Sequence, residues 1–399
     1  MNETRTVAFV ASERDRACPF DPSPDLRRMR EKDGLPRVRV LHPVLGEVEA
    51  AVVTRYDDVR AAFAHPRLVT GNGIDPDQPR TLYNQPGFLL AYSGAEHARL
   101  RGMLTRSFTV RQVERLLPTM EAIIEDHLDA MEQQGPGVDL VEAFALPIPS
   151  LAICELLEVP YATRSMFQRC SQVIMSGTAD AGQVIAASAE LHAAMADVVA
   201  RHRAAPGDGV LGTVVRQHGD ELTDEELIGF GITLLAGGHE TTATQLALSV
   251  LALLRHPGQL AALRDDPGVT ATAVEELLRH LAIPAPVLRT ATADVEINGQ
   301  PVAEGEYVLL SALTANRDPA LVPRDPDDLD LRRRPVTQLS FGFGVHQCLG
   351  QQLARMELKA ALPALLRRFP TLRLAVPESE LRFRTGSTVY GVEALPVAW

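Results

Sequence analysis

A single cysteine stands where a glycine-punctuated loop meets a predicted helix near the end of the chain. The stretch from Phe341 to Gly350 reads Phe-Gly-Phe-Gly-Val-His-Gln-Cys-Leu-Gly, and Cys348 is its eighth residue. Glycines let such a loop adopt backbone conformations closed to other residues, so that amide groups can surround one sulfur. The sulfur also faces the positive end of a helix dipole, and both effects favour the thiolate. A thiolate held in this way is a nucleophile, a redox sulfur or a metal ligand.

A second unusual stretch lies in the middle of the longest predicted helix. A capping box at Thr223 begins an apolar helix that extends to about Leu254, which is roughly 45 Å at about 1.5 Å per residue. Its centre reads, in order, Gly237, Gly238, His239, Glu240, Thr241 and Thr242. Each glycine costs a helix about 1 kcal/mol, so the pair indicates either a functional opening or a helix crossing that requires small residues. A zinc motif of the His-Glu-x-x-His type is excluded, because Ala243 replaces the second histidine.

Two further pairs combine charge with helical spacing. His97 and Arg101 share one helix face at i, i+4, as expected for an anion site or for a solvated basic helix start. Glu276 and Arg279 share a face at i, i+3, an arrangement that is common on protein surfaces. Arg289 follows in an extended segment. Spacing alone leaves both interpretations of each pair open.

Taken together, these stretches resemble the cytochrome P450 family. Phe341, Gly344, Cys348 and Gly350 match four residue types over ten positions of its haem-binding loop, and the other motifs extend the resemblance over residues 97–350. The resemblance implies the P450 fold, which is mainly α (α+β), with a helix-rich haem-binding body and a small β region. It also implies haem b as cofactor, with Cys348 as the axial thiolate that pushes electron density onto the iron.

The resemblance assigns roles to the other motif residues as well. Around the haem it implies His97, Arg101, Gly237, Gly238, Arg289, Phe341, Gly344, His346 and Gly350. Of these, His97, Arg101 and Arg289 would hold the propionates. Glu240 and Thr241 would be the catalytic acid and alcohol that relay protons, with the threonine bonded back to a carbonyl one turn earlier. His239 is expected to have a structural or pocket-wall role.

The Glu276–Arg279 pair would support the haem loop as a buried ion pair, completed by Arg333. The chain departs from the family pattern at Asp328, Leu329 and Gln338, where relatives often carry Arg, Phe and His. In the last predicted pair of strands, 381–384 and 389–392, the turn holds two candidate substrate contacts, Ser387 and Thr388.

Composition and local pattern indicate how these residues are positioned. The 399 residues are 46% hydrophobic and 5% aromatic with no linker-like segment, which predicts one helix-rich domain over residues 1–399. We expect a hairpin over 37–54, a small sheet over 295–310 and a long loop over 66–92, which the family resemblance implies would cover the substrate pocket. Helices are predicted over 110–134, 150–157, 185–203 and 349–369. In the last of these, Pro363 should cause a kink or a break.

Charge and cysteine usage exclude several classes of protein. The net charge of −12 argues against general binding of nucleic acid or anionic membranes. The four cysteines, Cys18, Cys154, Cys170 and Cys348, lack the spacing of a disulfide framework or a zinc cluster. No apolar run approaches the roughly 18 residues of a membrane span. We therefore expect a cytoplasmic monomer without a membrane anchor.

The resemblance implies a monooxygenase that inserts one oxygen atom from O2 into a small organic substrate. Electrons would come from a separate ferredoxin and ferredoxin reductase. Two interpretations fit Arg106, Arg111, Arg355 and Lys359: a basic docking face for such an acidic partner, or a solvated basic surface. Two alternatives are a peroxide-driven peroxygenase and a non-catalytic haem-binding partner or sensor. The Ala- and Arg-rich composition resembles actinobacterial members, which favours a polyketide or macrolide substrate over a terpenoid or aromatic one.

Overall fold

The structure is a computed structural model that describes residues 6–8, 14–15, 18–42, 46–71, 73–75, 77, 81, 84–160, 163–175, 179–385 and 387–399. Its helices are α1 (Pro24–Glu31), α2 (Tyr56–Ala64), α3 (Gly94–Thr105), α4 (Val110–Glu114), α5 (Leu117–Gln134), α6 (Pro147–Leu157), α7 (Arg164–Met175), α8 (Ala181–Ala204), α9 (Val210–His218), α10 (Asp224–Gly238), α11 (Glu240–Arg255), α12 (Pro257–Asp265), α13 (Thr270–Leu281), α14 (Ala312–Asn316) and α15 (Gln351–Arg368). The predicted mainly helical α+β class is confirmed.

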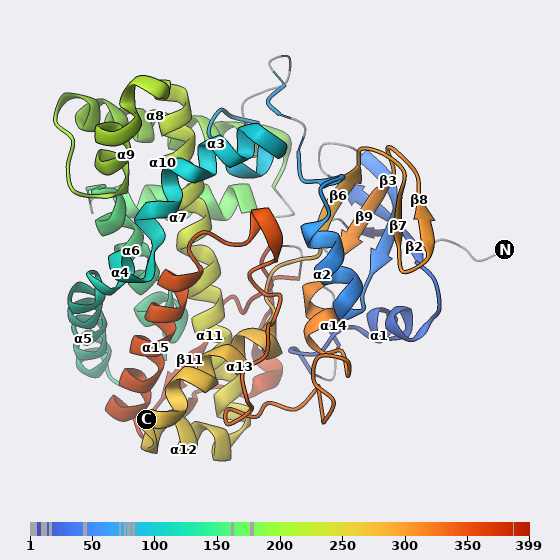
Figure 1. Cartoon of the computed structure of the whole chain (residues 1–399). Helices are drawn as coiled ribbons and strands as arrows, with labels where there is room; N and C mark the ends of the chain where they lie inside the picture. The colour runs from blue at the N-terminus through green and yellow to red at the C-terminus, as the bar shows by residue number, and fades with distance from the viewer. Residues whose placement is uncertain are drawn as a thin grey trace.

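The long predicted helix forms as two helices that follow one another through the helical body (Figure 1). α10 begins at the predicted capping box, in which the side chains of Thr223 and Glu226 each accept from the other's backbone amide. α11 begins after an interruption at His239, and most of its residues are buried. The single predicted helix is thus interrupted inside the stretch that the family resemblance expects to open locally.

The β region is centred on a six-stranded sheet on one side of the molecule (Figure 1). The strand order is β1 (Thr6–Ala8), β2 (Arg37–His42), β3 (Gly46–Val53), β9 (Tyr307–Leu310), β6 (Val287–Ala291) and β4 (Leu68–Val69). The predicted antiparallel hairpin of β2 and β3 is confirmed. Side chains alternate along β2, where Val38 and Val40 are buried while Arg37 and Arg39 face outward, as expected for a sheet with one covered face.

Two smaller sheets complete the β region. β5 (Val138–Asp139), β11 (Pro396–Ala398) and β10 (Arg373–Leu374) form one, and β7 (Val295–Ile297) with β8 (Gln300–Val302) forms the other. β7 and β8 are joined by the predicted turn, since Asn298 and Gly299 both have positive φ angles. Tyr307–Leu310, which was predicted in the same small sheet, instead pairs with β3 and β6.

Three further expectations differ from the structure. α15 continues without a break through Pro363, because both its flanks are packed: Ala361, Leu362, Ala364 and Leu365 are all buried. The last predicted strand pair is reduced to a single bridge between Phe383 and Val392 with short hydrogen bonds beside it. In the predicted 66–92 loop, β4 and a turn at Leu89–Ala91 are ordered, and residues 72, 76, 78–80 and 82–83 lie outside the described part.

No single helix in the described ranges is long and apolar enough to cross a membrane. One bent pair passes the same test, made of Asp224–Arg255 and Pro257–Asp265 with 114° between them, by length and composition only. Most of α11, the second half of that first segment, is buried inside the protein.

Candidate active site

The Cys348 loop lies between the helical body and the sheet (Figure 1) and is shaped by two glycines with positive φ. Gly342 has φ +68° and Gly344 has φ +76°, which L side chains rarely adopt. A Cβ at Gly344 would also lie 3.0 Å from the Cα of Ala64 in α2, so glycine is required there for close packing. The loop closes on itself where the amide of Cys348 donates to the carbonyl of Phe341 at 2.8 Å.

Cys348 is accessible to solvent although many protein atoms surround its sulfur. Burial raises the pKa of its thiol, while the amide of Gly350 and the guanidinium groups of Arg101 and Arg355 lower it. The net shift of the thiol pKa is upward, because desolvation outweighs the amide and charge effects that favour the thiolate. A coordinated metal cation would reverse this balance, since it deprotonates a ligating thiol.

One arginine beside the loop is held more firmly than the sequence indicated. Arg355 in α15 forms a two-pronged ion pair with Glu275 of α13, at 2.6 and 3.1 Å. Its guanidinium carbon also lies 4.6 Å from the ring centre of Phe341. Because its charge is already paired and its side chain is only 18% exposed, Arg355 supports the loop from behind rather than presenting a free charge at the surface.

The structure brings four nitrogen-rich side chains together above the loop. His97 and Arg101 come from α3, Arg289 from β6 and His346 from the loop itself. The centres of the two imidazole rings lie 3.9 Å apart with the rings tilted by 41°, and Arg101 donates to the carbonyl of Gln347 at 2.5 Å. The i, i+4 pair on α3 is therefore part of a converging cluster rather than a solvated helix start.

This cluster lacks a negative partner in the described part of the chain. Nε2 of His97, Nδ1 of His346, and Nε and Nη1 of Arg289 are buried without a hydrogen-bond partner. Burial lowers the pKa of Arg289 to about 10. The pKa of His346 is lowered to about 3, mainly by burial and to a smaller extent by the neighbouring basic side chains. Unpaired buried donors are costly, so the cluster fits a ligand with buried carboxylates. Haem, which carries two propionate groups, has the chemistry that this donor set requires.

The two adjacent glycines at the end of α10 have different surroundings. A Cβ at Gly237 would meet nothing within 4 Å, so its backbone faces open space. A Cβ at Gly238 would lie 3.0 Å from the side chain of Ile153 in α6, so this glycine allows two helices to pack closely. The sequence allowed either a functional opening or a helix crossing at this glycine pair, and the structure contains both. Gly237 lies at the opening, and Gly238 lies at the crossing with α6.

At the interruption, hydroxyl groups bond to the backbone of the preceding turn. Thr241 donates to the carbonyl of Gly237 at 2.7 Å, as predicted, and Thr242 donates to that of Gly238 at 3.4 Å. His239 is buried, with Nδ1 lying 2.8 Å from the carbonyl of Leu235, which agrees with a structural role. The open space at Gly237 and the Thr241 hydroxyl are therefore neighbours.

Glu240 has a partner that sequence reasoning missed. Its carboxylate is buried and forms an ion pair with Arg384, which also donates to the hydroxyl of Thr244 at 2.7 Å. Arg384 follows Glu240 by 144 residues and was predicted only as part of a terminal strand. No local spacing in the sequence indicates this contact.

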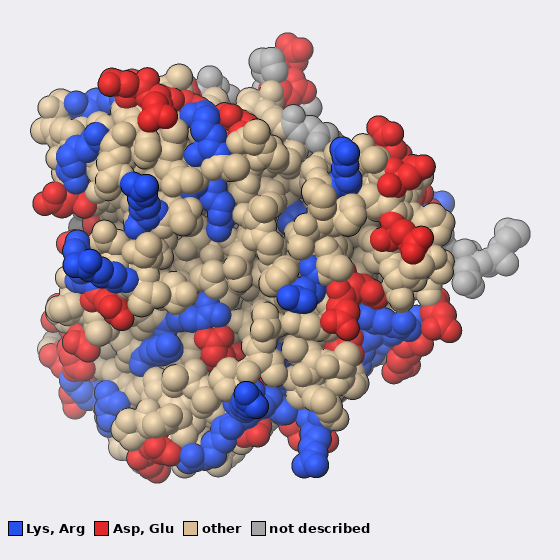
Figure 2. Space-filling model, viewed as in Figure 1, with Lys and Arg blue, Asp and Glu red and all other residues tan. Residues whose placement is uncertain are grey.

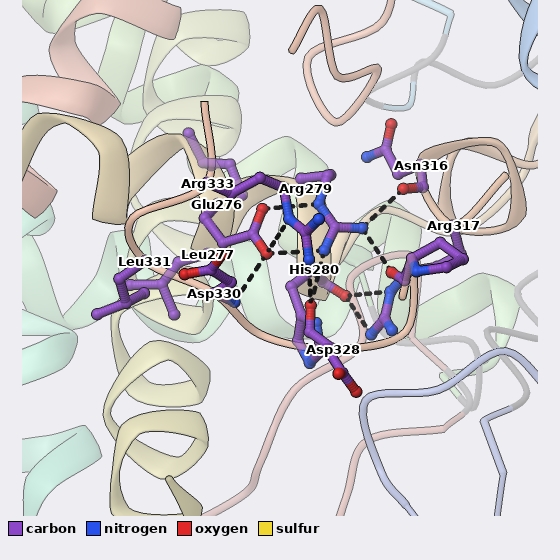
Figure 3. A network of polar contacts seen from close by, with 12 residues as sticks. Glu276, Leu277, Arg279, His280, Asn316, Arg317, Asp328, Asp330, Leu331 and Arg333 are labelled. Atoms are coloured by element: carbon purple, nitrogen blue, oxygen red, sulfur yellow. Dashed lines mark hydrogen bonds and ion pairs between the residues drawn. The ribbon is translucent and has the colours of Figure 1, made fainter. Parts of the chain in front are cut away.

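Behind the Cys348 loop, the predicted buried ion pair is confirmed (Figure 3). Glu276 and Arg279 of α13 contact each other at 2.7 and 2.8 Å and are 3% and 1% exposed, while Arg333 joins Glu276 at 3.1 Å. Arg279 donates to the carbonyl of Asn316, whose side chain in turn binds the backbone of Leu339, close to the start of the loop. The pair therefore anchors the backbone that leads into the Cys348 loop.

The departures from the family pattern leave this anchor intact. Arg279 and Arg333 both donate to the backbone carbonyl of Asp328, so its side chain is not needed for the contact. Leu329 is buried in the core, and Gln338 accepts from the amide of Ser340 at 2.6 Å. At the chain's far end, the hydroxyl of Thr388 is buried without a partner among the described residues, as a substrate contact would be.

Comparison with known proteins identifies the family. The family model described as cytochrome P450 matches residues 268–383. Cytochrome P450-SU2 of Streptomyces griseolus is 42% identical to this chain over 396 residues, covering 98% of this chain and 96% of the relative. The chain belongs to the cytochrome P450 family. P450 proteins bind haem through a cysteine thiolate, so haem b is the cofactor of this P450.

Solved P450 structures share the fold over essentially the whole chain. The LnmA cytochrome P450 hydroxylase from the leinamycin biosynthetic pathway of Streptomyces atroolivaceus has a TM-score of 0.88 and 41% identity, covering 99% of this chain and 100% of that one. CYP105P1 in complex with filipin I has a TM-score of 0.90 and 38% identity, covering 100% and 99%. This P450 is thus similar to bacterial P450s, Streptomyces proteins among them.

Proposed function

We propose that this P450 is a monooxygenase that inserts one oxygen atom from O2 into an organic substrate, with Cys348 as the axial thiolate ligand of its haem. When bound, haem supplies the iron at which O2 is activated. The cluster of His97, Arg101, Arg289 and His346 would orient the haem, because the arginines would pair with its propionates and the neutral imidazoles would donate hydrogen bonds to them. The unpaired donors of that cluster support this orientation.

The observation that carries the catalytic proposal is the hydroxyl of Thr241 beside open helix backbone. Because this hydroxyl donates to the carbonyl of Gly237, its oxygen remains free to accept a hydrogen bond from water in the groove. Splitting O2 consumes protons, and a hydroxyl at that place can hold the water that delivers them. Glu240, the next residue, is the nearest acid in the sequence and would resupply the protons.

A monooxygenase also requires a source of electrons. We propose a ferredoxin with its reductase as the donors. Arg106, Arg111 and Lys359 are exposed, and Figure 2 shows Lys and Arg groups over the α3, α4 and α15 part of the face that holds the Cys348 loop. Such a face suits an acidic partner. Arg355 is withdrawn from the predicted docking set because Glu275 neutralises it.

For the substrate, we propose a secondary metabolite of the polyketide or macrolide class. Support comes from similar proteins: one is a hydroxylase of the leinamycin biosynthetic pathway, and another was solved in complex with filipin I. Pentalenic acid synthase of Streptomyces avermitilis, 40% identical over 99% of this chain, supports the terpenoid alternative. A spectral-shift screen of the holoprotein against both classes of compound would decide between them.

The test of the proposed function is Thr241→Ala, which removes the hydroxyl and changes little volume. We expect the variant to bind substrate and consume reduced nicotinamide through its redox partners, while product per electron pair falls severalfold and hydrogen peroxide rises. Thr242→Ala is the matched control, because that hydroxyl bonds at 3.4 Å to a glycine packed against α6, and it should stay coupled. Unchanged coupling in Thr241→Ala would contradict the relay. Turnover of wild type with peroxide alone would instead indicate a peroxygenase.

A further inference from the structure

Arg384 binds two side chains on one face of α11. One end of its guanidinium group, Nη1, contacts Oε1 of Glu240, and the other end, Nη2, donates to the hydroxyl of Thr244 at 2.7 Å. Glu240 and Thr244 are four residues apart, so they lie one above the other on the helix. A planar guanidinium group can bridge such a pair, whereas a lysine ammonium group acts as a point charge. The carboxylate of Glu240 is therefore held in one place on the helix.

The backbone around Arg384 is built to place this guanidinium group. Its amide donates to the carbonyl of Gly391 at 2.7 Å, next to the bridge between Phe383 and Val392. A Cβ at Gly391 would lie 2.7 Å from Nη2 of Arg384 and 2.6 Å from the side chain of Thr244. Any larger residue at position 391 would therefore push the guanidinium group or the threonine away.

Each side chain of this ion pair has one polar atom without a hydrogen-bond partner among the described residues. Oε2 of Glu240 and Nε of Arg384 are buried and have no hydrogen-bond partner among the described residues. Glu240 is 4% exposed, whereas the Arg384 side chain is 27% exposed, so the pair connects a buried oxygen with a side chain that reaches solvent. Buried donor and acceptor atoms without a protein partner are the usual places for ordered water.

We propose that Arg384 is the positioning residue of the proton relay: it keeps Glu240 ionised and leaves Oε2 as the oxygen that takes up and releases the proton. The relay role rests on the proposed monooxygenase function, but the control of the charge of Glu240 does not. A buried carboxylate that loses its cation is left uncompensated and takes up a proton instead. A neutral side chain at position 384 would thus lock Glu240 in its protonated form.

Infrared spectroscopy of the resting holoprotein at neutral pH tests this directly. We expect Arg384→Gln to gain the carbonyl stretch of one protonated carboxyl group in addition to those present in wild type. The double variant Arg384→Gln/Glu240→Gln should lose that band, which assigns it to Glu240. Glu357, a second buried carboxyl group, contributes equally to both variants and cancels in their difference. If Arg384→Gln shows no added band, Arg384 only clamps the C-terminal segment to α11, and the proposal is wrong.

Arg384→Lys keeps the inference testable if the glutamine variant does not fold. Lysine keeps the charge but cannot bridge Glu240 and Thr244, so part of this variant should show the carboxyl band of Glu240 at neutral pH. Absence of that band in Arg384→Lys would overturn the proposal. In turnover, product per electron pair should be lower in Arg384→Lys than in wild type. The infrared result needs no turnover, so its failure is distinguishable from failure of the monooxygenase function.

Discussion

At the residue scale, burial decides the charge of the side chains around the site. The amide of Gly350 favours the thiolate, yet burial still raises the pKa of Cys348. Burial likewise lowers the pKa of Arg289 to about 10 in a cluster without carboxylates. Each of these groups is therefore arranged for a partner of opposite charge, iron for the sulfur and propionates for the cations.

The ligand prediction concerns Cys348 alone. Cys348→Ser should abolish the red-shifted Soret band of the reduced carbonyl complex, because only thiolate supplies the required electron density. The absorption spectrum of the reduced protein under carbon monoxide measures this. Cys18→Ser is the control, since Cys18 lies on the lead-in segment beside Arg255, and that variant should keep the band. Persistence of the band in Cys348→Ser would show that another residue is the ligand.

Glu357 in α15 offers a pH prediction with a definite sign. It is 1% exposed, neither carboxyl oxygen has a partner among the described residues, and burial raises its pKa well above the usual 4.5. As the pH rises above 4.5, the unfolded chain releases this proton while the folded protein retains it. The contribution of Glu357 to the free energy of unfolding is therefore complete below about pH 4.5 and is lost as the pH rises, by up to about 1.4 kcal/mol per pH unit.

Glu357→Gln removes this titration while keeping the shape. We expect the variant to gain stability relative to wild type between pH 5 and pH 8, as measured by urea unfolding of the holoprotein at both values. Glu121→Gln, at an exposed position of α5, should show no such gain. A difference between Glu357→Gln and wild type that shrinks with rising pH would mean that Glu357 is ionised in the folded protein.

At the element scale, the interruption between α10 and α11 places chemistry and packing on successive residues. Gly237 faces open space, whereas Gly238 contacts Ile153 of α6. The helix is thus packed firmly on one face and left open on the other. This arrangement keeps the groove in place, because α6 holds the backbone where hydrogen bonding along the helix is interrupted.

Alanine at each glycine separates these two roles. Gly238→Ala forces a methyl group against Ile153 and should lower the free energy of unfolding by about 1–3 kcal/mol. Gly237→Ala has room and gains helix propensity, so its stability should be unchanged or higher by up to about 1 kcal/mol. It should nevertheless narrow the groove and weaken the binding of carbon monoxide to the reduced protein. Urea unfolding and carbonyl titration measure the two effects, and the reverse order of stabilities would contradict the assignment.

At the scale of the whole molecule, charge is distributed unevenly. The net charge is −12, so an acidic ferredoxin would be repelled by the protein as a whole and must be attracted by a local surface. The face with the Cys348 loop carries the exposed Arg106, Arg111 and Lys359, whereas Asp and Glu groups gather mainly at its margins (Figure 2). Docking should therefore depend on a few residues and on salt.

Reversing two of these charges tests the docking face. At low salt, Arg106→Glu/Arg111→Glu should lower the rate of haem reduction by ferredoxin severalfold. The slowing of this reaction by added salt should also disappear, because the attraction that salt screens is then absent. Reduction by dithionite should be unchanged. Arg39→Glu on β2, in the sheet, is the control and should be reduced at the wild-type rate. Equal rates in all three proteins would place the docking surface elsewhere.

The sequence by itself determined the features that depend on neighbours along the chain. The Cys348 loop, the capping box at Thr223 and the Glu276–Arg279 pair each span ten residues or fewer, so local conformation and spacing contain their geometry. The mainly helical class follows from the same local patterns. The Thr241 bond to Gly237 was predictable for this reason too, since it closes within one helical turn.

Only the tertiary structure decided which distant groups meet and how far they are removed from water. Arg384 lies 144 residues from Glu240, and Glu275 lies 80 residues from Arg355, so no spacing rule connects either pair. The sign of the pKa shift at Cys348 and the uninterrupted helix at Pro363 depend in the same way on atoms from elsewhere in the chain. Desolvation and packing are sums over all neighbours in space, and the order of residues does not specify those neighbours.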